Sequence, residues 1–152
     1  MSKGTLKSDL GLLVVRAGTG LSLLLFHGWG KLSGGPETWE KVGGSMENLG
    51  ITFLPVFWGF MAAMSEFFFA LLLVLGLFFR PAAALLAFTM FVAVVRHLSL
   101  PPDAAGAGWK GASHALELCA VFTGLFILGS GRFALSRLVF RRRSVIHEEP
   151  EI

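Results

Sequence analysis

Residues 54–98 read LPVFWGFMAAMSEFFFALLLVLGLFFRPAAALLAFTMFVAVVRHL, and this stretch decides the fold. It is almost entirely apolar and is long enough for two crossings of a hydrocarbon core, each of which takes about 20 residues. Arg80-Pro81 predicts a short hinge in the middle, because a proline in the first turn of a helix loses no helical hydrogen bond. We therefore expect two membrane helices, over about 54–79 and 81–98.

Two further apolar runs, at about 10–29 and 113–128, extend this pattern on either side. The composition agrees, because 54% of the residues are hydrophobic and only 15% are charged, too few to cover the surface of a soluble domain. The sequence thus predicts an all-α membrane protein, a bundle of four transmembrane helices. We expect one domain over 1–143, followed by a flexible cytoplasmic tail at 144–152.

The distribution of lysine and arginine predicts the orientation. Basic residues near span ends favour the cytoplasmic side, and here they gather at both termini and in the short central hinge: Lys3, Lys7, Arg80, Arg132, Arg137, Arg141, Arg142 and Arg143. Both termini are therefore expected in the cytoplasm, with the chain a multi-pass protein of the bacterial inner membrane. The basic tail predicts contact with anionic lipid and not with nucleic acid.

Several ionisable residues lie inside the predicted spans, where each costs about 2.5–3.5 kcal/mol on insertion scales and usually faces the bundle interior. Helical spacing predicts three inward faces. They are Arg16, Gly20, Leu23 and His27 on the first span; Gly59, Ala63, Glu66 and Ala70 on the second; and His114, Glu117, Val121 and Gly124 on the fourth. Together these faces predict a polar cavity that opens toward the outer surface and has Glu66 at its floor.

Simpler interpretations compete with this cavity. Arg16 and Glu66 can form a buried ion pair that only fixes helix register, and Lys31 and Arg96 can extend to the membrane surface. His114-x-x-Glu117 has the spacing of helical metal ligands, but one such pair is weak evidence, and we predict no metal site. The single cysteine, Cys119, excludes an intramolecular disulfide and cannot hold an iron–sulfur cluster.

Short motifs in the first two spans carry a family resemblance. The first span contains Val15-Arg16-Ala17-Gly18 and then Phe26-His27-Gly28-Trp29-Gly30-Lys31-Leu32. In the second, Glu66 precedes a leucine-rich run over 71–77, and Phe79-Arg80-Pro81-Ala82-Ala83 follows. Near the fourth span, Glu117 and Gly129-Ser130-Gly131-Arg132 continue the pattern, which runs from about Leu10 to Leu138.

This combination resembles the DoxX family of four-helix inner-membrane proteins. The resemblance implies a subunit of a redox complex, linked to sulfur-compound oxidation through thiosulfate:quinone oxidoreductase or to defence against oxidative stress. Where the family often has Ser-Leu-Asp after its Gly-x-Gly turn, this chain has Phe133-Ala134-Leu135-Ser136. The missing acidic residue puts any role in docking a partner in doubt.

The favoured hypothesis is a quinone-linked redox subunit, although the sequence leaves open whether the chain is itself an enzyme. A quinone needs an apolar slot and groups that bind its carbonyl oxygens and deliver protons. We assign catalytic roles to Glu66, Glu117, Arg16 and His97, and ligand binding to His27, Lys31, Arg96, His114 and Phe67. No covalently bound cofactor is expected.

Two alternatives from other classes remain. One is a non-catalytic anchor that holds partner enzymes at the membrane through its basic tail. The other is a carrier of small solutes or protons, which four spans without a repeat would support best as an oligomer. In each case we expect membrane lipid around the bundle and either a partner subunit or a second copy of the chain beside it.

Overall fold

The computed structural model describes residues 6–137 and is an all-helical bundle. Within this part of the chain, four helical segments are long and apolar enough to cross a membrane: Leu6–Ser33, Pro55–Leu75, Phe79–Ser99 and Gly108–Leu128. The prediction of an all-α membrane protein with four spans is therefore confirmed. The predicted tail at 144–152 and the basic residues Arg141, Arg142 and Arg143 lie outside the described residues.

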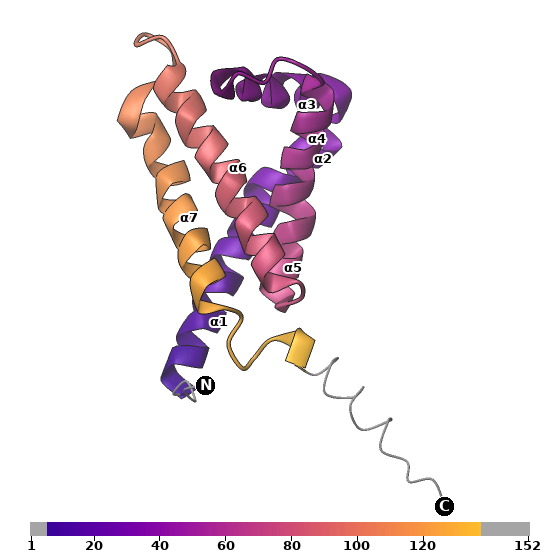
Figure 1. Ribbon diagram of the computed structural model, residues 1–152, viewed down its shortest axis with the longest axis vertical. Helices are drawn as coiled ribbons and strands as arrows, with labels where there is room; N and C mark the ends of the chain where they lie inside the picture. The colour runs from indigo at the N-terminus through magenta and orange to yellow at the C-terminus, as the bar shows by residue number, and fades with distance from the viewer. Residues whose placement is uncertain (1–5, 138–152) are drawn as a thin grey trace, which may run out of the picture.

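The first two spans are each built from three helical segments. The first comprises α1 (Leu6–Leu23), a five-residue π turn η1 (Leu24–Gly28) and α2 (Trp29–Ser33). The second comprises α4 (Pro55–Met64), another π turn η3 (Ser65–Phe69) and α5 (Ala70–Leu75). Between the two spans, the helix α3 (Gly35–Gly43) and the 3₁₀ helix η2 (Gly44–Leu49) lie across one end of the bundle (Figure 1).

The third and fourth spans are the continuous helices α6 (Phe79–Ser99) and α7 (Gly108–Leu128). The turn before α6 lies earlier than the predicted Arg80-Pro81 hinge. Gly76 ends α5 in the left-handed conformation with φ 71°, which glycine adopts without steric cost, and Phe78 follows at φ 42°. Pro81 consequently lies in the first turn of α6, where it still removes no helical hydrogen bond.

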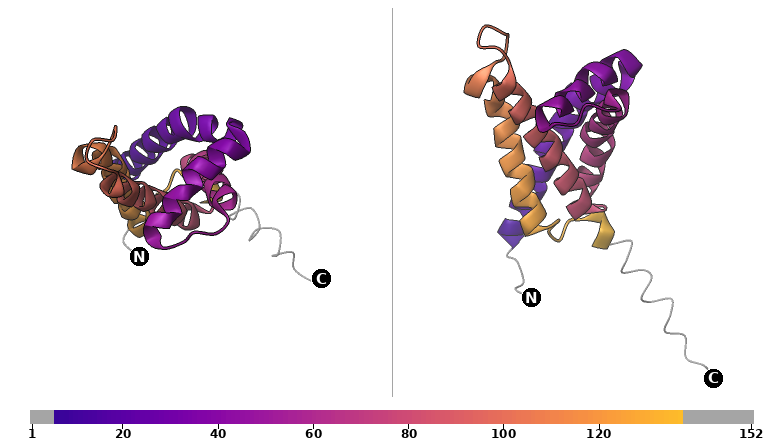
Figure 2. Two further views of the ribbon diagram at one scale, coloured as in Figure 1. Left: turned by 90° about the horizontal axis from the view of Figure 1, so that it is seen from above. Right: turned by 45° about the horizontal axis from the view of Figure 1, so that its top comes forward.

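The bundle is shaped like a V (Figures 1 and 2). At the closed end, where α1 begins and α5 and α7 end, the helices converge. At the open end, the α6–α7 pair leans away from α4, and α3 lies beside the gap. The two ends of the described chain lie together at the closed end, as four crossings require. The shape leaves room between the arms at one end of the molecule only.

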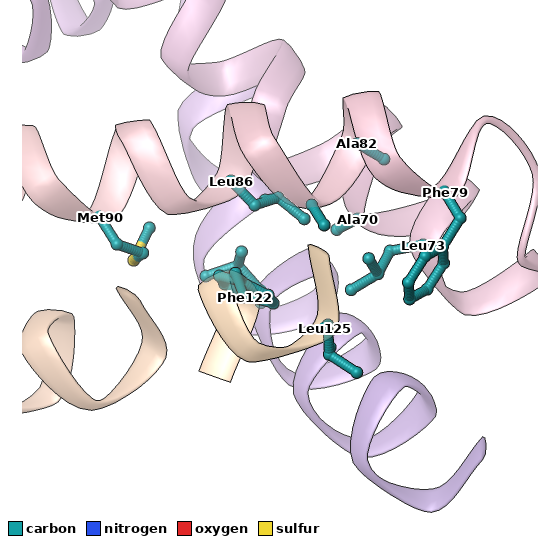
Figure 3. Close-up of a cluster of buried hydrophobic side chains, with 10 residues drawn as sticks. Ala70, Leu73, Phe79, Ala82, Leu86, Met90, Phe122 and Leu125 are labelled. Atoms are coloured by element: carbon teal, nitrogen blue, oxygen red, sulfur yellow. The ribbon is translucent and has the colours of Figure 1, made fainter. Parts of the chain in front are cut away.

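A hydrophobic core fills the point where the arms meet (Figure 3). Small residues of α5 and α6, such as Ala70, Ala82 and Ala83, are fully buried and let the helices approach closely. Larger side chains from α1, α5, α6 and α7 then fill the remaining space: Leu23, Leu73, Phe79, Leu86, Met90, Phe122 and Leu125. Because this cluster lies toward the closed end, it holds the arms there and leaves the open end to other contacts.

At the open end, α3 is held against α4 by two glycines. A Cβ added to Gly59 would lie 1.7 Å from the carbonyl oxygen of Trp39, and one added to Gly43 would lie 1.8 Å from that of Pro55. No larger residue fits either position, so the two backbones touch directly. The indole Nε1 of Trp39 also donates a hydrogen bond to the carbonyl of Lys31 at 2.8 Å. The short helix α3 is thus fixed over α4 and joined to the end of α2.

Candidate functional site

The two π turns of the first and second spans lie against each other in the middle of the bundle. Gly28 of η1 packs so closely on η3 that an added Cβ would lie 2.5 Å from the carbonyl oxygen of Glu66. Such single wide turns within α-helices occur frequently at functional sites. They also explain one error of the sequence analysis. The extra residue in η1 shifts the helical phase by one position, so Gly28 continues the buried face of Arg16, Gly20 and Leu23, and His27 is exposed.

This close contact brings a lysine and a glutamate together. The Nζ of Lys31, one turn beyond Gly28, lies 2.5 Å and 2.6 Å from the two carboxylate oxygens of Glu66 and donates to both. The Glu66 side chain is only 2% exposed, whereas that of Lys31 is 29% exposed. Lys31 thus neutralises a carboxylate in the middle of a span. The predicted buried face of the second span is confirmed, since Gly59, Ala63, Glu66 and Ala70 are all buried.

A cavity of about 470 Å³ extends from this ion pair toward the open end, between α4 and α6 and beneath α3 and η2. Its volume lies within the range of small-molecule sites. Most of its wall is apolar, and much of this surface is aromatic or methionine: Met46, Phe57, Trp58, Met61, Phe69 and Phe88. These apolar side chains form a shaft, and the Lys31–Glu66 ion pair lies at its floor.

Further polar groups line the cavity at two levels. On its wall, the hydroxyl of Thr89 donates a hydrogen bond to the hydroxyl oxygen of Ser65 at 2.9 Å, which ties α6 to η3. Toward the open end, Arg96, His97 and Lys41 line the cavity. The Nδ1 of His97 lies 2.7 Å from the carbonyl of Gly106 and, since a carbonyl only accepts, must donate to it.

Three cavity residues have exposed side chains. Leu85 and Phe88 of α6 are 37% and 48% exposed, and Phe57 of α4 is 48% exposed. All three belong to membrane-spanning helices. The cavity wall is therefore formed in part by accessible apolar side chains of two spans.

Arg16 occupies a different place from the one expected for a partner of Glu66. It is 1% exposed and lies at the closed end, where its Nη1 donates to the carbonyl of Ser130 at 2.7 Å and its Nη2 to that of Phe133 at 2.6 Å. Gly76 makes room for it, because an added Cβ there would lie 2.6 Å from Nη1. Arg16 thus fastens the segment after α7 across the closed end of the bundle.

An acidic residue that the sequence analysis did not single out supports the same segment. Asp9 is 6% exposed; its Oδ1 accepts a hydrogen bond from the backbone N–H of Arg132 at 3.0 Å, and its Oδ2 lies 3.2 Å from Nε of that arginine. The signal was present, because Asp9 lies seven residues before Arg16, two helical turns along the same buried face.

The remaining predicted site residues lie outside the cavity. The inward face expected on the fourth span is wrong: His114 and Glu117 are exposed, and α7 buries Ala112, Ala115, Phe122 and Leu125. These alanines allow α7 to approach α6 closely, which decides the rotation of the helix. The ring of Phe67 packs 5.9 Å from that of Trp29, away from the ion pair, and within residues 6–137 no group of three or more metal-ligating side chains comes together.

The fold and the buried ion pair define a small multi-pass membrane protein whose spans enclose a ligand-sized cavity with a charged floor. The family assignment follows from the comparison with protein families, in which the DoxX family matches residues 11–98. The chain belongs to the DoxX family. The matched region contains Arg16, Lys31, Glu66, Arg96 and His97, and therefore the whole cavity, whereas the carbonyls that hold Arg16 lie beyond it. No match was found among curated proteins or among solved structures.

Proposed function

We propose that this protein is a quinone-binding subunit of a redox complex in the bacterial inner membrane. The observation that carries the proposal is the cavity: an aromatic and methionine-rich shaft between two membrane spans that ends on the Lys31–Glu66 ion pair. Quinones are lipid-soluble rings with carbonyl oxygens, so they need an apolar slot with a few placed polar groups. Membership of the DoxX family supports the redox context, because of the quinone-linked role that the resemblance implies.

Each polar group of the cavity has a role in this proposal. The ammonium of Lys31 donates a hydrogen bond to a quinone carbonyl, and Arg96 or His97 meets the oxygen at the other end of the ring. Reduction of a quinone to its quinol takes two electrons and two protons. The electrons come from a partner redox protein, while Glu66 and His97, the titratable groups nearest the two ends of the cavity, pass the protons.

The test measures quinone binding by the full chain in lipid nanodiscs. Two ligands are titrated separately by calorimetry, a short-tailed ubiquinone analogue and a short-tailed menaquinone analogue. Filling the shaft with Ala93→Phe should weaken binding at least about tenfold, as should Glu66→Gln, which removes the charged acceptor of Lys31. Glu37→Gln is the matched control, because Glu37 is exposed at the start of α3 and does not line the cavity. Unchanged binding in Ala93→Phe would exclude the cavity as the quinone site.

The same preparation separates the alternative functions. A membrane anchor would bind its partner equally well after Ala93→Phe and lose it when the basic tail residues Arg141, Arg142 and Arg143 are replaced. A carrier would take up solute in proteoliposomes. The closed end favours the quinone proposal over a carrier, because Arg16 and Asp9 fasten the segment at 129–134 across the path that a solute would have to leave by.

A further inference from the structure

One face of α7 carries polar residues that the bundle leaves exposed. His114 and Glu117 are both exposed, and they lie on one stripe with Val121 and Gly124, spaced three, four and three residues apart. Glu117 is the tenth residue of the 21-residue helix and therefore lies near the middle of the span. Among the described residues it forms neither a hydrogen bond nor an ion pair. The stripe consequently places a carboxylate at the depth where lipid solvates it least.

A second polar side chain extends this surface onto the first span. The imidazole ring of His27 in η1 lies 5.7 Å from that of His114, at an interplanar angle of 30°. His27 is also exposed. Ionisable residues within spans almost always face protein or water and seldom acyl chains. The surface formed by His27, His114 and Glu117 therefore has the composition of a covered interface and not of a lipid-facing one.

We infer that a second copy of this chain covers the stripe, giving a dimer with a twofold axis along the membrane normal. In such an interface the same patch meets itself, so residue i of one copy contacts residue j of the other and the reverse. His114 and Glu117 are one helical turn apart, so each Glu117 meets His114 of the second copy. Both carboxylates then accept hydrogen bonds from imidazoles, and one sequence supplies both partners.

The packing of the stripe fits a close helix pair. The spacing of 114, 117, 121 and 124 is the alternation of three and four residues that keeps one seam facing a parallel helix. Val121 lies at the inner edge of this seam, where it also packs against the core of its own chain. At Gly124 an added Cβ would meet nothing within 4 Å, so the backbone of α7 is open to a neighbour there. Small residues at such positions let membrane helices approach closely. The charge pairs would set the register of the two copies, and Gly124 would bring them into contact.

This interface is separate from the cavity, which none of His27, His114, Glu117 and Gly124 lines. The inference therefore goes beyond the proposed function and does not depend on it. It also gives Glu117 a role other than catalysis. An interface of this kind does not use Leu85 and Phe88, because those cavity residues belong to α6 and not to the stripe on α7.

Disulfide cross-linking in native membranes tests the inference. In a Cys119→Ser background, Gly124→Cys should form a covalent dimer on mild oxidation. Thr123→Cys is the matched control, because Thr123 is exposed at the same depth but points about 100° away around the helix. Light scattering of the unmodified chain in mild detergent should give the mass of two copies. A monomer by light scattering, or equal cross-linking at both positions, would overturn the inference.

A charge exchange distinguishes a second copy from a foreign helix. His114→Glu alone places four carboxylates in the interface and should weaken the dimer about tenfold. Adding Glu117→His to that variant restores each pair with its members exchanged, and the dimer should return. A foreign partner would not be recovered in this way. If the double variant folds, as judged by an unchanged thermal midpoint in detergent, and stays monomeric, the proposed pairing is wrong.

Discussion

The closed end of the bundle and the floor of the cavity each bury a charged side chain, and they hold it differently. At the closed end, the charge of Arg16 is held by the backbone carbonyls of Ser130 and Phe133, which belong to a segment that crosses that end. At the cavity floor, in the middle of the bundle, the charge of Glu66 is held by Lys31, a flexible side chain that is partly exposed. The first arrangement fixes structure, whereas the second leaves a charged pair that a ligand can reach.

The largest effect should come from removing the closed-end charge. Arg16→Met removes two hydrogen bonds from a buried guanidinium to backbone carbonyls, and hydrogen bonds to charged groups are worth about 1.5–3 kcal/mol each. We expect a loss of about 3 kcal/mol or more in the free energy of unfolding, measured by denaturant titration in detergent. Arg80→Met is the control, since Arg80 is exposed near the same end. A stable Arg16→Met protein would show that the segment after α7 is held by other contacts.

Next comes the glycine contact that holds α3 over the cavity. Gly59→Ala forces a methyl group into the carbonyl of Trp39, and overpacking of this kind costs about 1–3 kcal/mol. Limited proteolysis in the segment at 44–54 should accelerate as α3 lifts from α4. Gly18→Ala, whose added Cβ meets nothing within 4 Å, should leave cleavage unchanged. Equal cleavage of the two variants would mean that α3 is not clamped by Gly59.

The ion pair at the cavity floor should respond unequally to loss of either member. Lys31→Met leaves the Glu66 carboxylate, which is only 2% exposed, without its partner. Breaking a buried ion pair usually costs about 3–5 kcal/mol in the free energy of unfolding. We expect a smaller loss of about 2 kcal/mol here, because Lys31 is 29% exposed. Glu66→Gln should cost less, since the freed ammonium can turn toward water. Thermal midpoints of the two variants measure the difference. The reverse order would mean that Lys31, and not Glu66, is the constrained partner.

The smallest effect should come from Asp9→Asn. Asparagine keeps an oxygen that accepts from the N–H of Arg132 but loses the ion pair with its guanidinium, whose side chain is 47% exposed. Exposed pairs contribute about 0.2–1 kcal/mol, and salt screens them. The stability difference between Asp9→Asn and the unmodified chain should therefore shrink as salt is added. A loss that salt does not reduce would point to the hydrogen bond in place of the charge.

The sequence was informative wherever hydrophobic length or regular helical spacing decided the outcome. Four spans follow from apolar length, and the buried face at Gly59, Ala63, Glu66 and Ala70 follows from spacing. It failed at His27, because no sequence signal revealed the extra residue of η1 that shifts the phase. The prediction was also wrong on α7, where either the polar face or the alanine face could have turned inward. Close packing of Ala112 and Ala115 decided in favour of the alanine face.

Helical spacing could not predict the partners of the buried charges either, for a related reason. Arg16 and Glu66 were weighed as partners because both lie within spans, yet each finds a partner on another segment. Lys31 reaches Glu66 only because η1 and η3 pack at Gly28, and Arg16 reaches Ser130 and Phe133 only because the chain turns back beneath the bundle. Both contacts depend on how segments that are distant in the sequence pack against each other. The orientation of the termini stays a prediction from the distribution of lysine and arginine.

The paired π turns make the lengths of the first two spans interdependent. Deleting one residue from η1 would restore a regular α-helix and rotate everything beyond it by about 100°, which carries Lys31 off the carboxylate that it neutralises. A deletion in η3 would rotate the half of its span beyond the deletion against the other in the same way. In relatives that lack one wide turn, the residue equivalent to Lys31 should therefore be shifted by one position, or the residue equivalent to Glu66 should be replaced. A sequence alignment that ignores this shift would pair the wrong residues.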